Sequence, residues 1–209
     1  MAAVDFWYEF ASTYSYPAAM RVERLAQAAG VELRWRPFLL GPIFGAQGWN
    51  DSPFNIYPAK GHYMWRDMAR ICEAEGLTLR EPVRFPQNGL KAARIALIGA
   101  DEGWIAAFTR AVYLANFAGQ KDISDDAVLG EILTSLGLDA ASVVARANAA
   151  ENKARLKAET EVAIAKGVFG APSFTISGTG SGTGSGTGGD ELFWGNDRLE
   201  TALQWAQRG

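Results

Sequence analysis

The sequence predicts an α/β protein, because strand patterns open and close the chain and helical patterns fill its middle. Residues 4–38 read as strand, helix and strand. Residues 58–156 carry apolar side chains at helical spacing, and residues 167–208 return to two short strands and a final helix. A strand–helix–strand unit forms a parallel strand pair with a right-handed connection, and helices layered on such a sheet define the α/β class.

The first unit follows from its apolar spacing and from the residues that interrupt it. Residues 4–10 form an apolar and aromatic run with partial alternation, which is typical of a strand. Pro17 then lies in the first turn of a helix, where a missing N–H does no harm, and Gly30 ends that helix. Residues 31–38 alternate apolar and charged side chains, which predicts the second strand, and the glycine- and proline-rich segment 41–58 is predicted to be a loop.

The rest of the chain is predicted to be mostly helical until it returns to strands. The predicted helices are 60–75, 89–102, 104–118, 125–136, 139–148 and 149–166, followed by strands at 172–176 and 191–194 and a helix at 198–208. This order is that of a thioredoxin fold split by a helical insertion. We therefore expect residues 1–58 and 157–209 to form a thioredoxin-like domain and residues 59–156 to form an inserted all-helical domain.

One low-complexity segment stands between the last two predicted strands. Residues 177–189 read SGTG three times, followed by Gly189, and contain no apolar side chain to bury. Such a segment is predicted to be a flexible, linker-like loop within the C-terminal hairpin. It is either an engineered or slipped-repeat extension of a hairpin tip, which the perfect period favours, or a natural mobile loop.

Composition excludes several classes of function. The chain of 209 residues has 20 basic and 23 acidic side chains, a net charge of −3 and no strongly basic stripe, so nucleic acid is not an expected partner. Neither a signal peptide nor a membrane-spanning apolar run is seen, which predicts a cytoplasmic protein with no membrane partner. The single cysteine, Cys72, excludes a CxxC motif and is expected in the core, and no residue spacing supports a metal site.

The junction between the first strand and the first helix is the first candidate site. Ser12 and Ser15 have the CxxC spacing without sulfur, so the chain by itself has no dithiol chemistry. Unpaired N–H groups and the positive end of the helix dipole at this position stabilise a thiolate, including one supplied by a ligand. The alternative is that one of these serines caps the helix, which the spacing alone favours.

Two segments from the end of the chain complete the candidate site. Pro172 begins a strand, and the bond before it is a candidate for a cis peptide, as in thioredoxin-like folds where that proline faces the active-site helix. The backbone of Ala171 would then pair with a cysteinyl ligand. Asn196 and Asp197 open the last helix, where N–H groups suit a carboxylate and Asp197 suits an ammonium. The alternatives are an ordinary strand-edge proline and a plain helix cap.

Four motifs occur in order along the chain. They are Phe10-x-Ser12-x-Tyr14-Ser15-Tyr16, Pro58-x-Lys60-Gly61-x-Tyr63-Met64, Gly167-Val168-Phe169-Gly170-x-Pro172-Ser173-Phe174 and Phe193-Trp194-Gly195-x-Asp197-Arg198-Leu199. As a set, they closely resemble the 2-hydroxychromene-2-carboxylate isomerases and the kappa-class glutathione transferases, of the DsbA-like thioredoxin superfamily. The resemblance covers nearly the whole chain apart from the SGTG segment.

The resemblance implies a homodimer that binds glutathione between its two domains. Ser12 matches the catalytic serine of the family. Lys60 is the implied partner of the glycyl carboxylate, and Asn50 matches a loop asparagine. Ala171, beside Pro172, would pair with the cysteinyl unit, and the turn at residues 196–197 would hold the γ-glutamyl end. The implied cofactor-binding residues are Asn50, Lys60, Ala171, Pro172, Asn196 and Asp197.

The implied activity is a glutathione-dependent cis–trans isomerisation. It converts 2-hydroxychromene-2-carboxylate to trans-o-hydroxybenzylidenepyruvate, as in aromatic hydrocarbon catabolism, by reversible addition of the glutathione thiolate. Pocket walls for this aromatic acid are expected from Trp49, Phe54, Tyr63 and Trp65, unless these are core residues, with Arg66 or Lys60 meeting its carboxylate. The alternatives are a kappa-type glutathione S-transferase that acts on small electrophiles and a non-catalytic binding protein on a thioredoxin fold.

Overall fold

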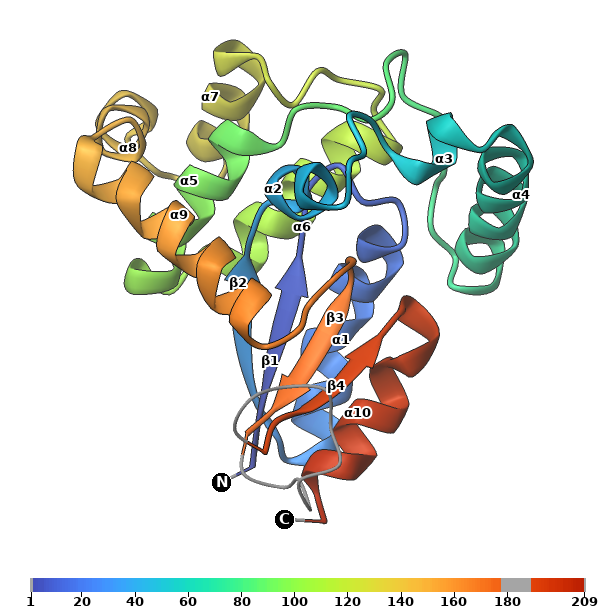
Figure 1. Cartoon of the computed structure of the whole chain (residues 1–209). Coiled ribbons are helices and arrows are strands. Elements are labelled where there is room, and N and C mark those ends of the chain that lie inside the picture. The colour runs from blue at the N-terminus through green and yellow to red at the C-terminus, as the bar shows by residue number, and fades with distance from the viewer. Residues whose placement is uncertain (1, 178–188, 209) are drawn as a thin grey trace.

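The fold is built on a mixed sheet with the predicted topology. The computed structural model describes residues 2–177 and 189–208. Within these residues, four strands lie in the order β2-β1-β3-β4 (Figure 1). They are β1 (Ala3–Tyr8), β2 (Glu32–Pro37), β3 (Ser173–Ile176) and β4 (Glu191–Trp194). The β1–β2 pair is parallel, and β3 runs antiparallel to both β1 and β4, so the predicted thioredoxin-like arrangement is confirmed.

The first helix has the predicted ends. Helix α1 (Ser15–Ala29) contains Pro17 in its first turn, and Gly30 follows it with a φ of 66°, a left-handed conformation that glycine adopts without cost. The N–H of Gly30 donates to the carbonyl oxygens of Ala26 and Gln27 and so closes the helix. Helix α10 (Leu199–Ala206) packs beside α1 on the same face of the sheet.

A block of helices stands over one end of the sheet (Figure 1). Its elements are α2 (Leu40–Ala46), α3 (Pro53–Ile56), α4 (Pro58–Ala74), α5 (Leu90–Glu102), α6 (Ile105–Phe117), α7 (Asp126–Ser135), α8 (Ala140–Ala147) and α9 (Ala150–Ala165). From α4 onward these ranges match the predicted helices to within two residues at each end. Asp125 and Asp139 cap α7 and α8 by accepting hydrogen bonds from backbone N–H groups, which explains why those boundaries are sharp.

The prediction of a loop at residues 41–58 is wrong, because this segment contains α2 and α3. Helix α2 buries Ile43 in a cluster with Trp7 and Phe38, and this long-range burial outweighs the glycines of the segment. Helix α3 begins with Pro53 in its first turn after Ser52, whose Oγ accepts a hydrogen bond of 3.3 Å from the N–H of Phe54.

The two faces of β1 belong to different clusters of the core. Val4, Phe6 and Tyr8 pack into the main cluster, which includes residues of α1, α10 and the helical block. Trp7 points to the other face, where it joins the smaller cluster that contains Ala163 of α9. This alternation follows from the two-residue period of a strand.

The end of the chain differs from the predicted single helix at 198–208. A 3₁₀ turn (Asn196–Arg198) comes first, and α10 begins only at Leu199. Neither Asn196 nor Asp197 caps α10, since the residue before that helix is Arg198, which makes no side-chain cap. The side chain of Asn196 instead accepts a hydrogen bond of 2.9 Å from Nη2 of Arg21 on α1, and this contact holds it away from the helix terminus.

Several other expectations concern the chain as a whole. Cys72 is buried as predicted, and burial raises the pKa of its thiol to about 11. Among the described residues, no helix combines the length and apolar character needed to cross a membrane. The predicted boundary at residue 157 lies inside α9, so the two-domain division stays a prediction. Of the predicted linker-like loop at 177–189, residues 178–188 lie outside the described residues.

Gly61 provides a test of how α3 and α4 pack, because a Cβ at this residue would overlap the carbonyl oxygen of Phe54. We expect Gly61→Ala to lower the free energy of unfolding by about 1–3 kcal/mol, despite the higher helix propensity of alanine. Gly130→Ala in α7 is the matched control, since no atom lies within 4 Å of its ideal Cβ. It should raise stability by about 0.5–1 kcal/mol in the same denaturant titration. Equal effects of the two substitutions would contradict this packing.

Candidate functional site

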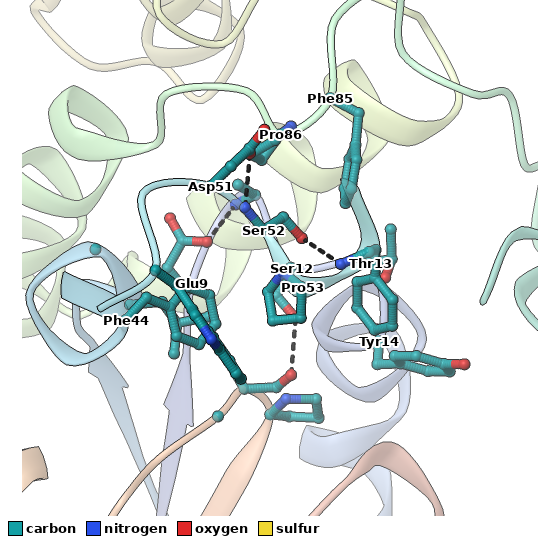
Figure 2. A pocket seen from close by; sticks show the side chains of 18 of the residues that line it. Glu9, Ser12, Thr13, Tyr14, Phe44, Asp51, Ser52, Pro53, Phe85 and Pro86 are labelled. Carbon is teal, nitrogen blue, oxygen red and sulfur yellow. Dashed lines mark hydrogen bonds between the residues drawn. The ribbon is translucent and has the colours of Figure 1, made fainter. Parts of the chain in front are cut away.

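One cavity collects the predicted catalytic serine and all of the predicted cofactor-binding residues. Its volume is about 1250 Å³, and it lies where the end of β1, the loops around α2 and α3, the start of α4 and the turns beside β3 and β4 meet (Figure 2). The predicted residues that line it are Ser12, Asn50, Lys60, Ala171, Pro172, Asn196 and Asp197. These residues come from positions far apart in the sequence, so their convergence on one cavity is a property of the tertiary fold.

Ser12 and the segment before β3 are in direct contact. The Oγ of Ser12 donates a hydrogen bond of 2.9 Å to the carbonyl oxygen of Ala171, as the dashed line in Figure 2 shows. The Ala171–Pro172 peptide is cis, as the sequence suggested. The strand–helix junction and the cis proline therefore face each other, in the arrangement expected of a thioredoxin-like site.

The two serines at the start of α1 have different surroundings. Ser12 lines the cavity, whereas Ser15 is fully buried and is not among the lining residues. The Oγ of Ser12 also lies 3.4 Å from the N–H of Ser15, a long contact that gives the helix terminus little support. Tyr14, which directly precedes α1, makes no side-chain cap. Ser12 is therefore directed mainly to Ala171, and the simple capping interpretation does not account for its position.

Two side chains of helix α6 hold the backbone of this junction in place. Tyr113 donates its hydroxyl to the carbonyl oxygen of Glu9 at 2.9 Å, and the side-chain amide of Asn116 donates to that of Phe10 at 3.2 Å. Burial raises the pKa of Tyr113 well above its usual value, so this phenol keeps its proton. Because both contacts are buried, the residues just before Ser12 have little freedom to move.

The turn after β4 reaches the cavity through Gly195. This residue has a φ of 116°, which side-chain-bearing residues rarely adopt, and its N–H donates 2.9 Å to the carbonyl oxygen of Pro172. Asn196 is buried against Arg21, which also forms an ion pair of 2.6 Å with Glu200. Asp197 is exposed and lines the cavity. The turn is therefore anchored to the proline segment on one side and to α1 on the other.

The opposite rim carries Lys60 and Asn50, both of them exposed. The Nζ of Lys60 lies 4.7 Å from the ring centroid of Tyr57, and within the described chain it has no ion-pair partner. Of the charged residues that line the cavity in the described chain, Lys60 is the cation. The acids are Glu9, Asp51, Asp67 and Asp197.

The aromatic wall was predicted only in part. Trp49, Phe54 and Tyr63 line the cavity. Trp65 does not, because its ring packs edge-on against Phe85 with a centroid distance of 5.1 Å, so the expectation for it is corrected to a packing role. Arg66 is likewise absent from the lining and is exposed elsewhere on α4, which leaves Lys60 as the predicted cation at the site.

Two exposed aromatic rings at the mouth of the cavity were not predicted. Phe169 and Trp194 lie with their ring centroids 4.9 Å apart and are 46% and 55% exposed. Gly170 leaves room for the indole Nε1 of Trp194, which a Cβ at that residue would overlap. Both rings lie within motifs that the sequence singled out, but only the pairing of β3 with β4 brings them together.

Glu9 is another lining residue that sequence reasoning missed. The residue is only 9% exposed, and its Oε2 accepts a hydrogen bond of 2.9 Å from the N–H of Ala11 (Figure 2). Burial raises the pKa of Glu9 to about 7, although hydrogen bonds from the amides of Ala11 and Ser12 partly oppose the shift. A carboxylate in an apolar run three residues before Ser12 was the available signal.

The α4 wall is tied to the start of α1 by two side-chain contacts. The hydroxyl of Tyr14 donates a hydrogen bond of 3.0 Å to Oδ2 of Asp67, and the hydroxyl of Thr13 donates one of 3.0 Å to the sulfur of Met64. Burial, with the neighbouring Asp67, raises the pKa of Tyr14 above its usual value. The helical block is therefore joined to the site at the residues that directly follow Ser12.

Comparison with known proteins gives a consistent assignment. The model of the DSBA-like thioredoxin domain matches residues 3–205. The 2-hydroxychromene-2-carboxylate isomerase of Sphingobium xenophagum is 30% identical over 201 residues, which cover 94% of this chain and 94% of that one. The protein of the same name from Pseudomonas putida is 29% identical over 199 residues, which cover 94% of this chain and 90% of that one. A solved structure of a 2-hydroxychromene-2-carboxylate isomerase has the same fold, with a TM-score of 0.82 at 24% identity over 99% of this chain and 95% of that one.

The raised pKa of Glu9 predicts a particular pH dependence of stability. Between the ordinary pKa of 4.5 and about 7, the folded chain holds a proton on Glu9 that the unfolded chain has lost. The free energy of unfolding should therefore fall as pH rises through this window, by up to about 3 kcal/mol. Above the window, the stabilisation from the proton on Glu9 should be lost. Denaturant titrations from pH 4.5 to pH 8 should show this fall in the wild type and a clearly smaller fall in Glu9→Gln, which keeps the raised pKa of Glu159.

The exposed Glu73 on α4 offers a matched control for this measurement. Glu73→Gln should keep the wild-type pH dependence, because it removes a solvated carboxyl and leaves the buried carboxyl of Glu9 in place. If the curves of the wild type and Glu9→Gln run parallel across the window, Glu9 is not held in its protonated form.

Proposed function

This chain belongs to the DSBA-like thioredoxin domain family and groups there with 2-hydroxychromene-2-carboxylate isomerases, and on that basis we propose that it is an isomerase of the same kind. It would convert 2-hydroxychromene-2-carboxylate to trans-o-hydroxybenzylidenepyruvate with glutathione as cofactor. The observation that carries the proposal is the contact between Ser12 and the segment before the cis proline, at the place where a redox member of the fold would need a cysteine.

The residues around the cavity fit glutathione. In the described chain, the N–H of Ala171 donates no hydrogen bond, so it remains open to an extended cysteinyl unit beside Pro172. Lys60 lacks an ion-pair partner within the same residues and suits the glycyl carboxylate. The turn at Asn196 and Asp197 offers a carboxylate for the γ-glutamyl ammonium. Asn50 lies on the same rim and is the proposed further contact.

Ser12 is the proposed catalytic residue of the chain. When bound, glutathione supplies a thiol whose reversible addition permits rotation about the substrate double bond. The hydroxyl of Ser12 now donates to Ala171, and by turning it can donate instead to a sulfur at the start of α1. Hydrogen bonding and the dipole of a 15-residue helix both favour the thiolate there. Cys72 offers no substitute, because it is buried and its pKa is raised.

The rest of the cavity suits an anionic aromatic acid. Phe44, Trp49 and Phe54 provide apolar wall, and Tyr63 stands on the rim with 62% of its surface exposed. Lys60 is the lining cation available to a substrate carboxylate. We propose this acid as the substrate class, within aromatic catabolism in the cytoplasm. A homodimer is also proposed, on the resemblance of the motifs alone.

A glutathione-stoichiometry assay tests the isomerase assignment. The hydroxychromene carboxylate is incubated with the protein and about a hundredth of an equivalent of glutathione, and product and free thiol are both measured. An isomerase should bring the substrate to its equilibrium with the trans product, with many turnovers for each glutathione and no loss of thiol, because the cofactor is returned after each turnover. Thiol loss in proportion to product would show a kappa-type transferase instead, and binding without turnover would show a non-catalytic protein.

The role of Ser12 is tested through the pKa of the bound thiol. Ultraviolet absorbance of the thiolate is titrated with pH for glutathione bound to the wild type and to Ser12→Ala. Removing the hydroxyl donor should raise the thiol pKa by about one to two units, since one charge-assisted hydrogen bond is lost. Ser15→Ala is the matched control, because Ser15 is buried outside the cavity and should leave this pKa unchanged. An unaltered pKa in Ser12→Ala would contradict the proposed role.

A further inference from the structure

The carboxyl of Glu9 is a second chemical group in the cavity, and glutathione binding does not account for it. Glu9 follows β1 directly and lines the same cavity as Ser12 and Phe44 (Figure 2). It lies outside the four motifs that carry the resemblance to known isomerases. A buried carboxyl costs free energy unless the fold or the function uses it, so its place beside Ser12 calls for an explanation.

The position of this carboxyl is fixed from several sides. Its Oε2 accepts from the N–H of Ala11 at 2.9 Å, and the backbone carbonyl of Glu9 accepts from Tyr113 and from the N–H of Ser12. Its Oε1 faces Gly89, where an added Cβ would come within 2.9 Å of it. Glycine therefore leaves space beside this oxygen, on the side where the 85–89 segment lines the cavity.

Few charged groups face Glu9. Helix α2 and the 85–89 segment line the cavity beside it, and neither contains a charged residue. Tyr113 of α6 is the titratable neighbour from below, and it keeps its proton. The other charged side chains on the cavity are Asp51, Lys60, Asp67 and Asp197. With the pKa of Glu9 near 7, its acid and carboxylate forms are both populated near neutral pH.

The ring of the proposed substrate must open before any rotation can occur, and a proton-transferring group accelerates that opening. One carbon of this ring carries a hydroxyl, a carboxylate and the ring oxygen, so the substrate is a cyclic hemiketal. Opening the ring removes the hydroxyl proton, forms a ketone, breaks the bond to the ring oxygen and leaves a phenol that must gain a proton. The proton count is unchanged overall, and one carboxyl that first accepts and then donates can serve both oxygens.

We propose that Glu9 is the proton relay for this ring opening, an inference that rests on the proposed isomerase function. The carboxylate takes the proton of the substrate hydroxyl as the ketone forms. The electron pair of the breaking carbon–oxygen bond passes to the ring oxygen, and the carboxylic acid of Glu9 then protonates that oxygen. Glu9 ends in its starting form, and neither an oxidant nor a further reactant is required.

The substitution Glu9→Gln separates a role in proton transfer from a purely structural role, because only the former requires a carboxyl group. Glu9→Gln keeps an oxygen that can accept from Ala11, so the loop should hold its shape, but the amide cannot relay a proton. Glu159→Gln on α9 is the matched control. Burial also raises the pKa of Glu159, yet this residue pairs with Arg36 and lies outside the cavity lining.

The test follows ring opening alone, in the full-length protein without glutathione. Magnetisation exchange in NMR spectra measures how fast 2-hydroxychromene-2-carboxylate interconverts with its ring-opened keto form, after subtraction of the rate without protein. The wild type should accelerate this exchange, with a rate that rises with pH and levels off above the pKa of Glu9. Glu9→Gln should reduce the protein-dependent exchange rate at least ten-fold and abolish its pH dependence. The exchange rate with Glu159→Gln should stay within two-fold of the wild-type rate.

Each outcome decides the proposal. Exchange in folded Glu9→Gln within three-fold of the wild type would overturn it, as would a wild-type protein that binds the substrate without accelerating exchange. Should thermal melting show that Glu9→Gln is unfolded, the wild-type rate and its pH profile decide: a rate that does not change with pH across the pKa of Glu9 would overturn the proposal. Failure of the isomerase function appears separately, as no trans product from the wild type when glutathione is added.

Discussion

The hydrogen bond from the Ser12 hydroxyl to the carbonyl oxygen of Ala171 joins the two segments around which the cavity is built. It joins residues 159 positions apart in the sequence, one between β1 and α1 and one just before β3. Each partner is also held independently, because β1 pairs with β3 through Trp7 and Ser173, and Pro172 accepts from the N–H of Gly195. The start of α1, the cis-proline segment and the turn after β4 therefore keep one mutual geometry, and a ligand that bridges them meets a preorganised site.

A serine at this position changes what the scaffold can do. With cysteine, the helix terminus would stabilise a thiolate of the protein, whereas Ser12 carries no sulfur and directs its hydroxyl to a backbone carbonyl. The same N–H groups and dipole then act on whatever sulfur a ligand brings. The polar surroundings are held rigidly, since Tyr113 and Asn116 fix the backbone before Ser12 through buried hydrogen bonds. In the proposed isomerisation, the protein orients the thiolate and the cofactor supplies the nucleophile.

The charges around the cavity constrain what it can bind. Lys60 is the lining cation in the described chain, and four acids share the lining with it. An anionic ligand must therefore rely on Lys60 and on backbone N–H groups, while the acids suit an ammonium or handle protons. Glu9 is buried and lines the cavity, and this burial raises its pKa toward neutrality. In the proposed function, ligand recognition falls to the exposed lining residues and proton transfer falls to the buried Glu9.

The sequence by itself determined the order of strands and helices, because local spacing and breakers such as Gly30 act within a few residues. It also identified the catalytic and cofactor-binding candidates that line the cavity, and all of these except Asn50 lie within four short contiguous motifs. Only the tertiary structure decided that residues 41–58 form α2 and α3, because burying Ile43 against Trp7 is a long-range gain. The same holds for Glu9, whose pKa depends on burial by α6 and the 85–89 segment, elements about eighty to a hundred residues away along the chain. Local sequence patterns specify helices and strands, but a carboxyl is desolvated, and distant residues meet at one cavity, only after those helices and strands pack.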